Sequence, residues 1–167
     1  DTGSIAIGLA TMVGVGLGIG LLNGLIIVRF AVSPLIVTLG MWSIAKGLAL
    51  ILTGGSPLYA VPGEIVDTIG YGTLAGIPTP AVVAVAMLVL GAVILRFTVF
   101  GRYVYAIGSN RVAAFNSGIN VKLHTVLVYM VCGGMAGVAA IVFTSWVSAA
   151  QPTAAAGYEL QSLAAVV

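Results

Sequence analysis

The chain has 167 residues, of which 60% are hydrophobic and only 6% are charged, and its net charge at pH 7 is +2. Soluble domains have about 25% charged residues, so this composition excludes a soluble globular protein. The few basic residues form no clustered face, which excludes a nucleic-acid binder, and the single cysteine, Cys132, excludes an internal disulfide. We therefore predict an all-α, polytopic transmembrane helix bundle.

Four stretches are long and apolar enough to cross a bilayer, which takes about 20 residues. In chain order, we expect spans at residues 5–28, 34–53, 77–95 and 125–147, and the start of a fifth near residue 160. Ser33 and Pro34 suit a helix start, and the TGGSP run at 53–57 suits a helix end. The chain starts at Asp1 and its last span is short, so we interpret residues 1–167 as an internal fragment of one transmembrane domain.

The charged residues predict the orientation of these spans. Lys and Arg accumulate in cytoplasmic loops of membrane proteins. In this chain all of them except Lys46 lie after the first span or in residues 96–124, at Arg29, Arg96, Arg102, Arg111 and Lys122. The loop at 54–76 has only Glu64 and Asp67 as charged residues. We therefore expect residues 96–124 on the cytoplasmic side and residues 54–76 on the outer side.

Glycines recur every fourth residue in the first and last complete spans, at Gly16, Gly20 and Gly24 and at Gly133 and Gly137. Such small faces let helix backbones approach closely within a membrane. Two interpretations remain open at this point: the faces pack within one subunit, or they form a dimer interface.

The sequence contains no motif that indicates ATP binding or proton transfer. It has no G-x-x-x-x-G-K-[ST] phosphate loop, which argues against ATP binding by this chain. No span has a pair of carboxylates, which argues against a proton relay. We expect no catalytic residue, no cofactor and no metal site.

The expected cytoplasmic loop contains a short helix of its own. Asn110 can cap a helix over residues 111–117, and Gly118 can end it. We expect this helix to expose the small side chains of Ala113, Ala114 and Ser117. It could dock on a soluble partner, or it could lie on the lipid headgroups as an interfacial helix; spacing alone favours neither.

The run at 100–121, FGRYVYAIGSNRVAAFNSGINV, closely resembles the cytoplasmic coupling segment of ABC-importer permeases for monosaccharides, of the ribose, xylose, arabinose and galactose type. Further runs resemble the same family in the same order: LNGL at 22–25, VSPLIVTLG at 32–40, GLAL at 47–50, LTGG at 52–55, AAQPT at 149–153 and GYEL at 157–160. Two departures stand out. Lys46 replaces a frequent Arg, and Arg111 and Val112 stand where the family often has acidic residues.

The resemblance implies a multi-pass permease subunit of the bacterial inner membrane that is not itself an enzyme. Its partners would be an ABC ATPase subunit, a periplasmic or surface sugar-binding protein, a second permease subunit and the lipid bilayer, with no role for nucleic acid. The family's longer members agree with the fragment interpretation. By resemblance, the residues that couple to the ATPase are Asn110, Ala113, Ala114, Ser117 and Gly118.

Five further residues are candidates for the transport pathway. A sugar needs hydroxyl and amide partners and an aromatic face, which Asn23, Thr38 and Trp42 could supply; helix packing is the alternative role. Lys46 lies inside an apolar span, where a charge needs water, a partner or the interface. Glu159 could pair with Lys46 or lie at the outer interface.

Other functions remain as alternatives. Related permeases for autoinducers, nucleosides or branched-chain amino acids share the architecture. A secondary transporter would have acidic residues inside its spans, and a structural subunit would leave the loop at 96–124 unexplained.

Overall fold

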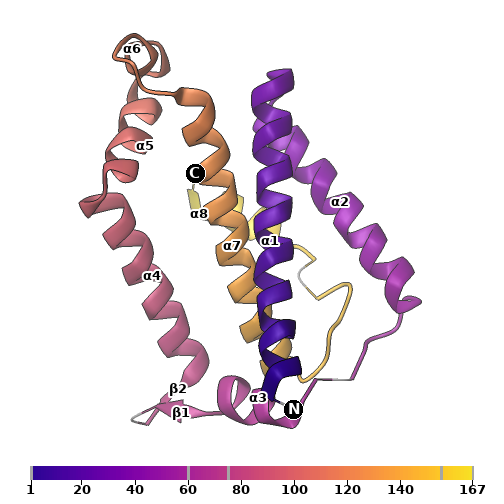
Figure 1. Cartoon of the computed structure of the whole chain (residues 1–167). Helices are drawn as coiled ribbons and strands as arrows, with labels where there is room; N and C mark the ends of the chain where they lie inside the picture. Colours follow the sequence, from indigo (N-terminus) through magenta and orange to yellow (C-terminus); the bar gives the residue numbers. More distant parts are fainter. Residues whose placement is uncertain (1, 60, 75, 155, 167) are drawn as a thin grey trace.

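Helices make up nearly all of the structure (Figure 1), a computed structural model that describes residues 2–59, 61–74, 76–154 and 156–166. In chain order the helices are α1 (Thr2–Phe30), α2 (Pro34–Thr53), α3 (Gly63–Ile65), the π-helix η1 (Val66–Gly70), α4 (Thr79–Phe97), α5 (Val99–Ser109), α6 (Arg111–Asn116), α7 (Val121–Val147) and α8 (Tyr158–Val166). A short antiparallel pair, β1 (Thr73–Leu74) and β2 (Ile77–Pro78), precedes α4. Helices α1, α2, α4 and α7 are long and apolar enough to cross a membrane. The predicted bundle of four spans is confirmed, and α8 lies where we expected the start of a fifth.

The ends of the spanning helices differ from the expected ones for local reasons. Helix α4 begins at Thr79 rather than at residue 77 because Ile77 and Pro78 belong to β2. Helix α7 begins at Val121, four residues before the expected start. Its start is set by Asn120, whose side chain accepts a hydrogen bond from the backbone N–H of Leu123 at 3.1 Å.

The centre of the bundle is the antiparallel pair of α1 and α7, which pack together along most of their length (Figure 1). Glycines allow this approach. A Cβ atom at Gly20 would collide with the carbonyl oxygen of Tyr129, and one at Gly24 would lie 2.8 Å from the Cα of Val126. A Cβ at Gly16 would collide with the backbone of Gly133. The two glycine faces therefore pack against each other within one chain, so the first interpretation of them is confirmed.

Helices α2 and α4 flank this pair and expose apolar side chains along their length. Ile51 and Leu52 of α2 are 78% and 83% exposed, and Leu88 of α4 is 73% exposed. None of the residues of α2 is buried. Exposed aliphatic surface of this extent needs an apolar solvent, which agrees with helices that face lipid or other membrane helices.

The outer loop folds onto the C-terminal end of α7. Gly70 of η1 packs so closely on Ser145 that a Cβ would collide with its carbonyl oxygen. The hydroxyl of Tyr71 donates to the carbonyl oxygen of Trp146 at 3.1 Å. Leu58 and Ala150 exchange two backbone hydrogen bonds, at 3.0 and 2.9 Å. The segment expected only as a loop is thus a folded cap on the end of the bundle that we expect to face outward.

The two ends of the bundle carry different charges, as the orientation argument requires. Figure 1 shows α5, α6, the start of α7 and the end of α1 at one end, with α3, β1 and β2 at the other. Arg29, Arg111 and Lys122 thus share one end, and Glu64 lies at the opposite end. This distribution fits a cytoplasmic α6 and an outer α3.

Candidate functional site

Residues 96–124, called the cytoplasmic segment after the side of the membrane on which we expect them, turn sharply between α4 and α5. The side chain of Thr98 accepts a hydrogen bond from the backbone N–H of Gly101 at 3.2 Å and caps α5. Gly101 is buried, and a Cβ there would collide with the carbonyl oxygen of Leu95. Only glycine fits this corner, so the sequence itself fixes the point at which the chain leaves the membrane span.

Helix α6 is held at both ends by the two residues expected to do so. The Asn110 side chain accepts hydrogen bonds from the backbone N–H groups of Val112 and Ala113 at 3.1 and 3.0 Å. Gly118 has a φ of +82°, a left-handed conformation that glycine adopts without strain. The N–H of Ile119 then bonds back to the carbonyl oxygen of Ala114 at 3.1 Å. The expected helix forms, although it ends at Asn116 rather than at residue 117.

The outward face of α6 differs from the expected one at a single position. Ala113, Ser117 and Gly118 are exposed, as predicted, but Ala114 is only 4% exposed. The prediction that Ala114 faces outward is wrong, because α6 packs that side against the rest of the cytoplasmic segment. Larger apolar side chains take its place on the surface: Val112 and Phe115 are 69% and 70% exposed.

These exposed side chains line an open groove of about 760 Å³ between α6 and the start of α7. The groove is also lined by two cations, Arg111 and Lys122, and by the connection from Gly118 to Asn120. It therefore combines apolar contact area with positive charge at the cytoplasmic end. Such a surface can bind an apolar projection of a partner that also carries negative charge.

His124 lies in the first turn of α7 and is half-buried against α5. From the sequence, we expect His124 to be an ordinary interfacial residue at the inner end of the last span. Its contact with α5 could not be predicted. The only available signal is the aromatic content of the run at 100–105, which the histidine ring contacts through Phe100 and Tyr103.

The pathway candidates divide into two groups. Asn23 lies on α1 between Gly20 and Gly24, is 9% exposed, and has an Oδ1 atom without a hydrogen-bond partner among the described residues. The Thr38 hydroxyl donates to carbonyl oxygens of its own helix, those of Pro34 at 3.0 Å and Leu35 at 3.2 Å.

Trp42 and Lys46 lie one turn apart on α2 and contact each other. The Nζ atom of Lys46 is 5.0 Å from the centre of the Trp42 ring, which is a cation–π distance. With Thr38 one turn before them, they form a stripe along α2. The side chain of Glu159 lies outside the described part of the chain, so its pairing with Lys46 stays a prediction.

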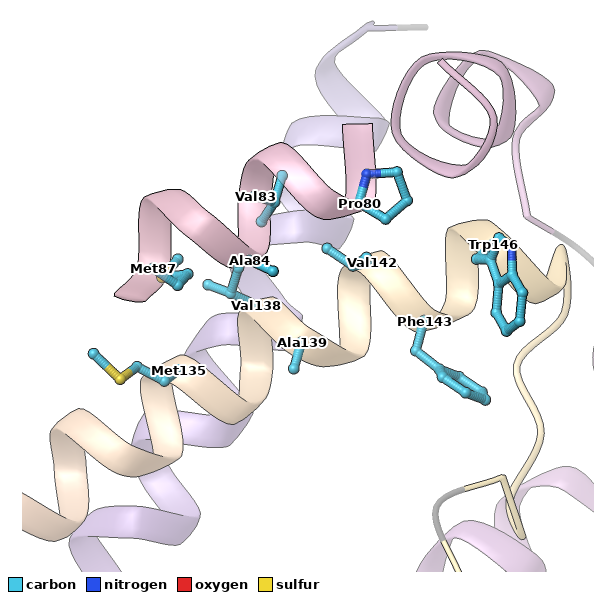
Figure 2. Close-up of a pocket in the computed structure, with 10 residues that line it drawn as sticks. All are labelled: Pro80, Val83, Ala84, Met87, Met135, Val138, Ala139, Val142, Phe143 and Trp146. Carbon is cyan, nitrogen blue, oxygen red and sulfur yellow. The ribbon is translucent and has the colours of Figure 1, made fainter. Parts of the chain in front are cut away.

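The groove between α4 and α7 has a different character (Figure 2). Its volume is about 350 Å³, and its lining is apolar apart from the indole N–H of Trp146. Met87 and Met135 lie at one end, and Pro80 and Trp146 lie at the other. A monosaccharide needs a hydrogen-bond partner for most of its hydroxyl groups, so this groove alone is not a sugar site.

A bundle of membrane-spanning helices with a folded cytoplasmic segment defines the class: a polytopic transport subunit. Comparison with known proteins identifies the family. The chain belongs to the permease components of branched-chain amino acid transport systems, whose family model matches residues 2–167. It is accordingly a multi-pass protein of the bacterial inner membrane.

Several relatives that this chain resembles are sugar permeases. The ribose import permease of Escherichia coli K12 is 37% identical over 164 residues, which cover 96% of this chain and 51% of that protein. The ribose import permease of Bacillus subtilis is 40% identical over 87% of this chain and 45% of its own length. The D-allose permease of Escherichia coli K12 is 33% identical over 95% of this chain and 49% of its own length. The chain thus spans about half the length of these relatives. No solved structure matches it.

Proposed function

We propose that this chain forms part of the membrane permease of an ATP-driven importer that moves a monosaccharide across the inner membrane. The observation that carries the proposal is the cytoplasmic segment, a capped helix that presents Val112 and Phe115 beside Arg111 and Lys122. Its relatives include permeases for ribose, D-allose and L-arabinose, all at 33–40% identity over most of this chain. These observations support a transport subunit that receives its energy from another protein.

Helix α6 is the proposed docking site for the ATPase subunit. Asn110 and Gly118 hold the helix ends, and Ala113 and Ser117 provide small exposed side chains that let a partner surface approach closely. Ala114 is buried on the opposite side of α6, where it packs against the rest of the cytoplasmic segment. Exposed apolar residues flanked by cations favour a protein groove with acidic residues at its rim. An anionic lipid surface is the competing occupant, and the experiment with α6 variants separates the two.

The stripe of Thr38, Trp42 and Lys46 on α2 is the proposed part of the pathway. An aromatic ring offers a flat apolar face to a sugar ring, and the Lys46 ammonium offers hydrogen-bond donors to its hydroxyl groups. Helix α2 contains no buried residue, so this stripe is open to a neighbouring element. Asn23 and Glu159 are assigned to the pathway with it. The remaining partners are a second permease subunit and a sugar-binding protein at the outer end.

A second candidate keeps the transport class and changes the cargo. The family to which the chain belongs is described as the permease component of branched-chain amino acid transport systems. Autoinducers and nucleosides are further possible cargoes within this second candidate. A cargo with a carboxylate and an apolar side chain would use the charge of Lys46 rather than the ring of Trp42.

The test is reconstitution of the full-length permease in vesicles with its ATPase subunit and its binding protein. ATPase activity would be measured against monosaccharides, leucine, nucleosides and an autoinducer. Stimulation by one loaded sugar is the expected result. Stimulation by leucine alone would transfer the assignment to the second candidate, and a permease that forms no complex with an ATPase would overturn the proposal.

Ala113→Trp tests the docking site in the same vesicles. A bulky ring on the exposed face of α6 should keep the partner away, and we expect substrate-stimulated ATPase activity to fall about tenfold, the effect of losing one well-packed contact. Ala81→Trp, on an exposed position at the outer end of α4, is the matched control and should leave activity unchanged. If Ala113→Trp lowers binding to anionic vesicles without changing ATPase activity, α6 is a lipid-binding helix instead.

A further inference from the structure

The histidine at the start of α7 makes two ring contacts with α5 and one hydrogen bond at the start of its own helix. Its ring stacks on Phe100 with 6.2 Å between ring centres and an interplanar angle of 25°. Its edge contact with Tyr103 is closer, with 4.9 Å between ring centres and an angle of 89°. The Nδ1 atom of His124 lies 2.9 Å from the carbonyl oxygen of Asn120. Because a carbonyl oxygen only accepts, Nδ1 carries a proton and donates it, which fixes the ring orientation.

Beyond these rings, α5 faces α7 across an open groove of about 220 Å³, which is lined by Val104 and Ile107 of α5 and by Thr125, Val128 and Tyr129 of α7. Helices α4 and α7 diverge toward the cytoplasmic end (Figure 1), and the apolar groove of about 350 Å³ lies between them. Helix α5 continues from α4 after the tight corner at Gly101. The arm formed by α4 and α5 meets α7 along α4, where a Cβ at Gly91 would lie 3.6 Å from the Cε atom of Met135, and again at the rings around His124.

On its other side, α7 packs closely against α1. The glycine faces bring its backbone into contact with the backbone of α1, so α1 and α7 move as one body. A displacement of α6 can reach this body along the short connection from Gly118 to Asn120, or through α5. The short connection is held by backbone hydrogen bonds, from the N–H of Ile119 to the carbonyl oxygen of Ala114 at 3.1 Å and from the N–H of Val121 to the carbonyl oxygen of Ile119 at 2.8 Å. The ring contacts provide the second route.

We propose that His124 is a positioning residue that transmits movement of α6, through Phe100 and Tyr103 of α5, to the α1–α7 pair. This inference rests on the proposed function, because it assigns a route for the coupling between ATPase and pathway. His124 touches no substrate and no nucleotide; it acts by keeping α5 against α7 while the docked partner moves α6. Without the ring, α5 would lose these contacts with α7, and the route through α5 would be weakened.

If His124 only fills space, its loss should have a different effect from the loss of a residue that transmits movement. Loss of packing lowers stability and leaves the ratio of sugar transported to ATP hydrolysed unchanged. Loss of transmission lowers that ratio while the complex still assembles and hydrolyses ATP. The ratio in reconstituted vesicles is therefore the decisive quantity.

The experiment compares His124→Ala, His124→Phe and the wild type in the assembled full-length complex. For His124→Ala we expect about a tenfold lower transport-to-ATP ratio, the size expected from losing two ring contacts. His124→Phe keeps the ring contacts and should restore the ratio to within about twofold. Phe143→Ala is the matched control, since it removes a ring contact with Trp146 at the outer end of the same helix and should leave the ratio unchanged.

A distance measurement keeps the test decisive if His124→Ala transports too little to measure. Spin labels at Tyr105→Cys on α5 and Ala136→Cys on α7, in a Cys132→Ser background, report the separation of the two helices. We expect a broader distance distribution in His124→Ala than in the wild type. An unchanged distribution, or a normal transport ratio in His124→Ala, overturns the inference. A wild-type complex without sugar-stimulated ATPase activity overturns the proposed function instead.

Discussion

Single glycines decide how close the two central helices come. Gly20 and Gly133 each lie where a Cβ would collide with a carbonyl oxygen of the facing helix, whereas Gly14 and Gly18 on the same α1 have nothing within 4 Å. The sequence pattern picked out the first group by its spacing of four. It could not tell whether the partner face was in the same chain or in a second copy, because both arrangements use the same small residues.

Gly20→Ala should destabilise the protein by about 1–3 kcal/mol, since the new methyl group has to push one backbone away from another. The thermal unfolding of the purified protein in detergent measures this as a lower midpoint. Gly18→Ala is the matched control and should be neutral or slightly stabilising, because alanine has the higher helix propensity. Equal midpoints for the two variants would contradict the close approach of α1 and α7.

Among the elements, α6 was predictable because its signals are local. An Asn cap, six helical residues and a glycine stop are all contained in one short stretch. The orientation of that helix was not predictable, and neither was the burial of Ala114, since both are decided by packing against α5 and α7. Helix α5 was missed as a separate element because its start depends on the corner at Thr98 and Gly101, where a glycine meets a residue of the preceding helix.

A helix of six residues depends strongly on its cap, since so short a helix is not stable alone. Asn110→Ala removes the acceptor for two backbone N–H groups and should cost about 1 kcal/mol of local stability. We expect faster hydrogen exchange at the amides of residues 112–116 and weaker co-purification of the ATPase subunit. Asn110→Ser keeps a capping oxygen and should behave nearly as the wild type; a similar loss in both variants would indicate a direct role of the amide group instead.

For the whole molecule, hydropathy was sufficient to predict the four spans, and the charges predict an orientation that stays a prediction. Both properties are sums over many residues, so they tolerate local departures such as Lys46 inside α2. The folded outer cap was not predictable, because it depends on contacts between distant segments such as Tyr71 with Trp146 and Leu58 with Ala150. For the same reason, the contact of His124 with α5 left no signal in the sequence beyond the nearby aromatic residues.

The orientation makes a prediction for labelling in cells. In a Cys132→Ser background, a cysteine at Asp67 should react with a membrane-impermeant maleimide in intact cells whose outer membrane is permeable to it. A cysteine at Asn116 should react only after the inner membrane is opened. Both side chains are exposed in the structure, so burial does not explain a difference. The reverse pattern would show that α6 faces outward and would exclude docking on an ATPase.

The pairing of α1 with α7 also means that the two central helices are synthesised at different times. About a hundred residues separate Gly24 from its contact at Val126, and translation adds about 5–20 residues per second. The first helix therefore waits about 5–20 s in the membrane before its partner has been made. During that interval its glycine face is open to lipid or to the insertion machinery. A slow-translating stretch between the two helices would lengthen this unprotected period and lower the yield of assembled protein.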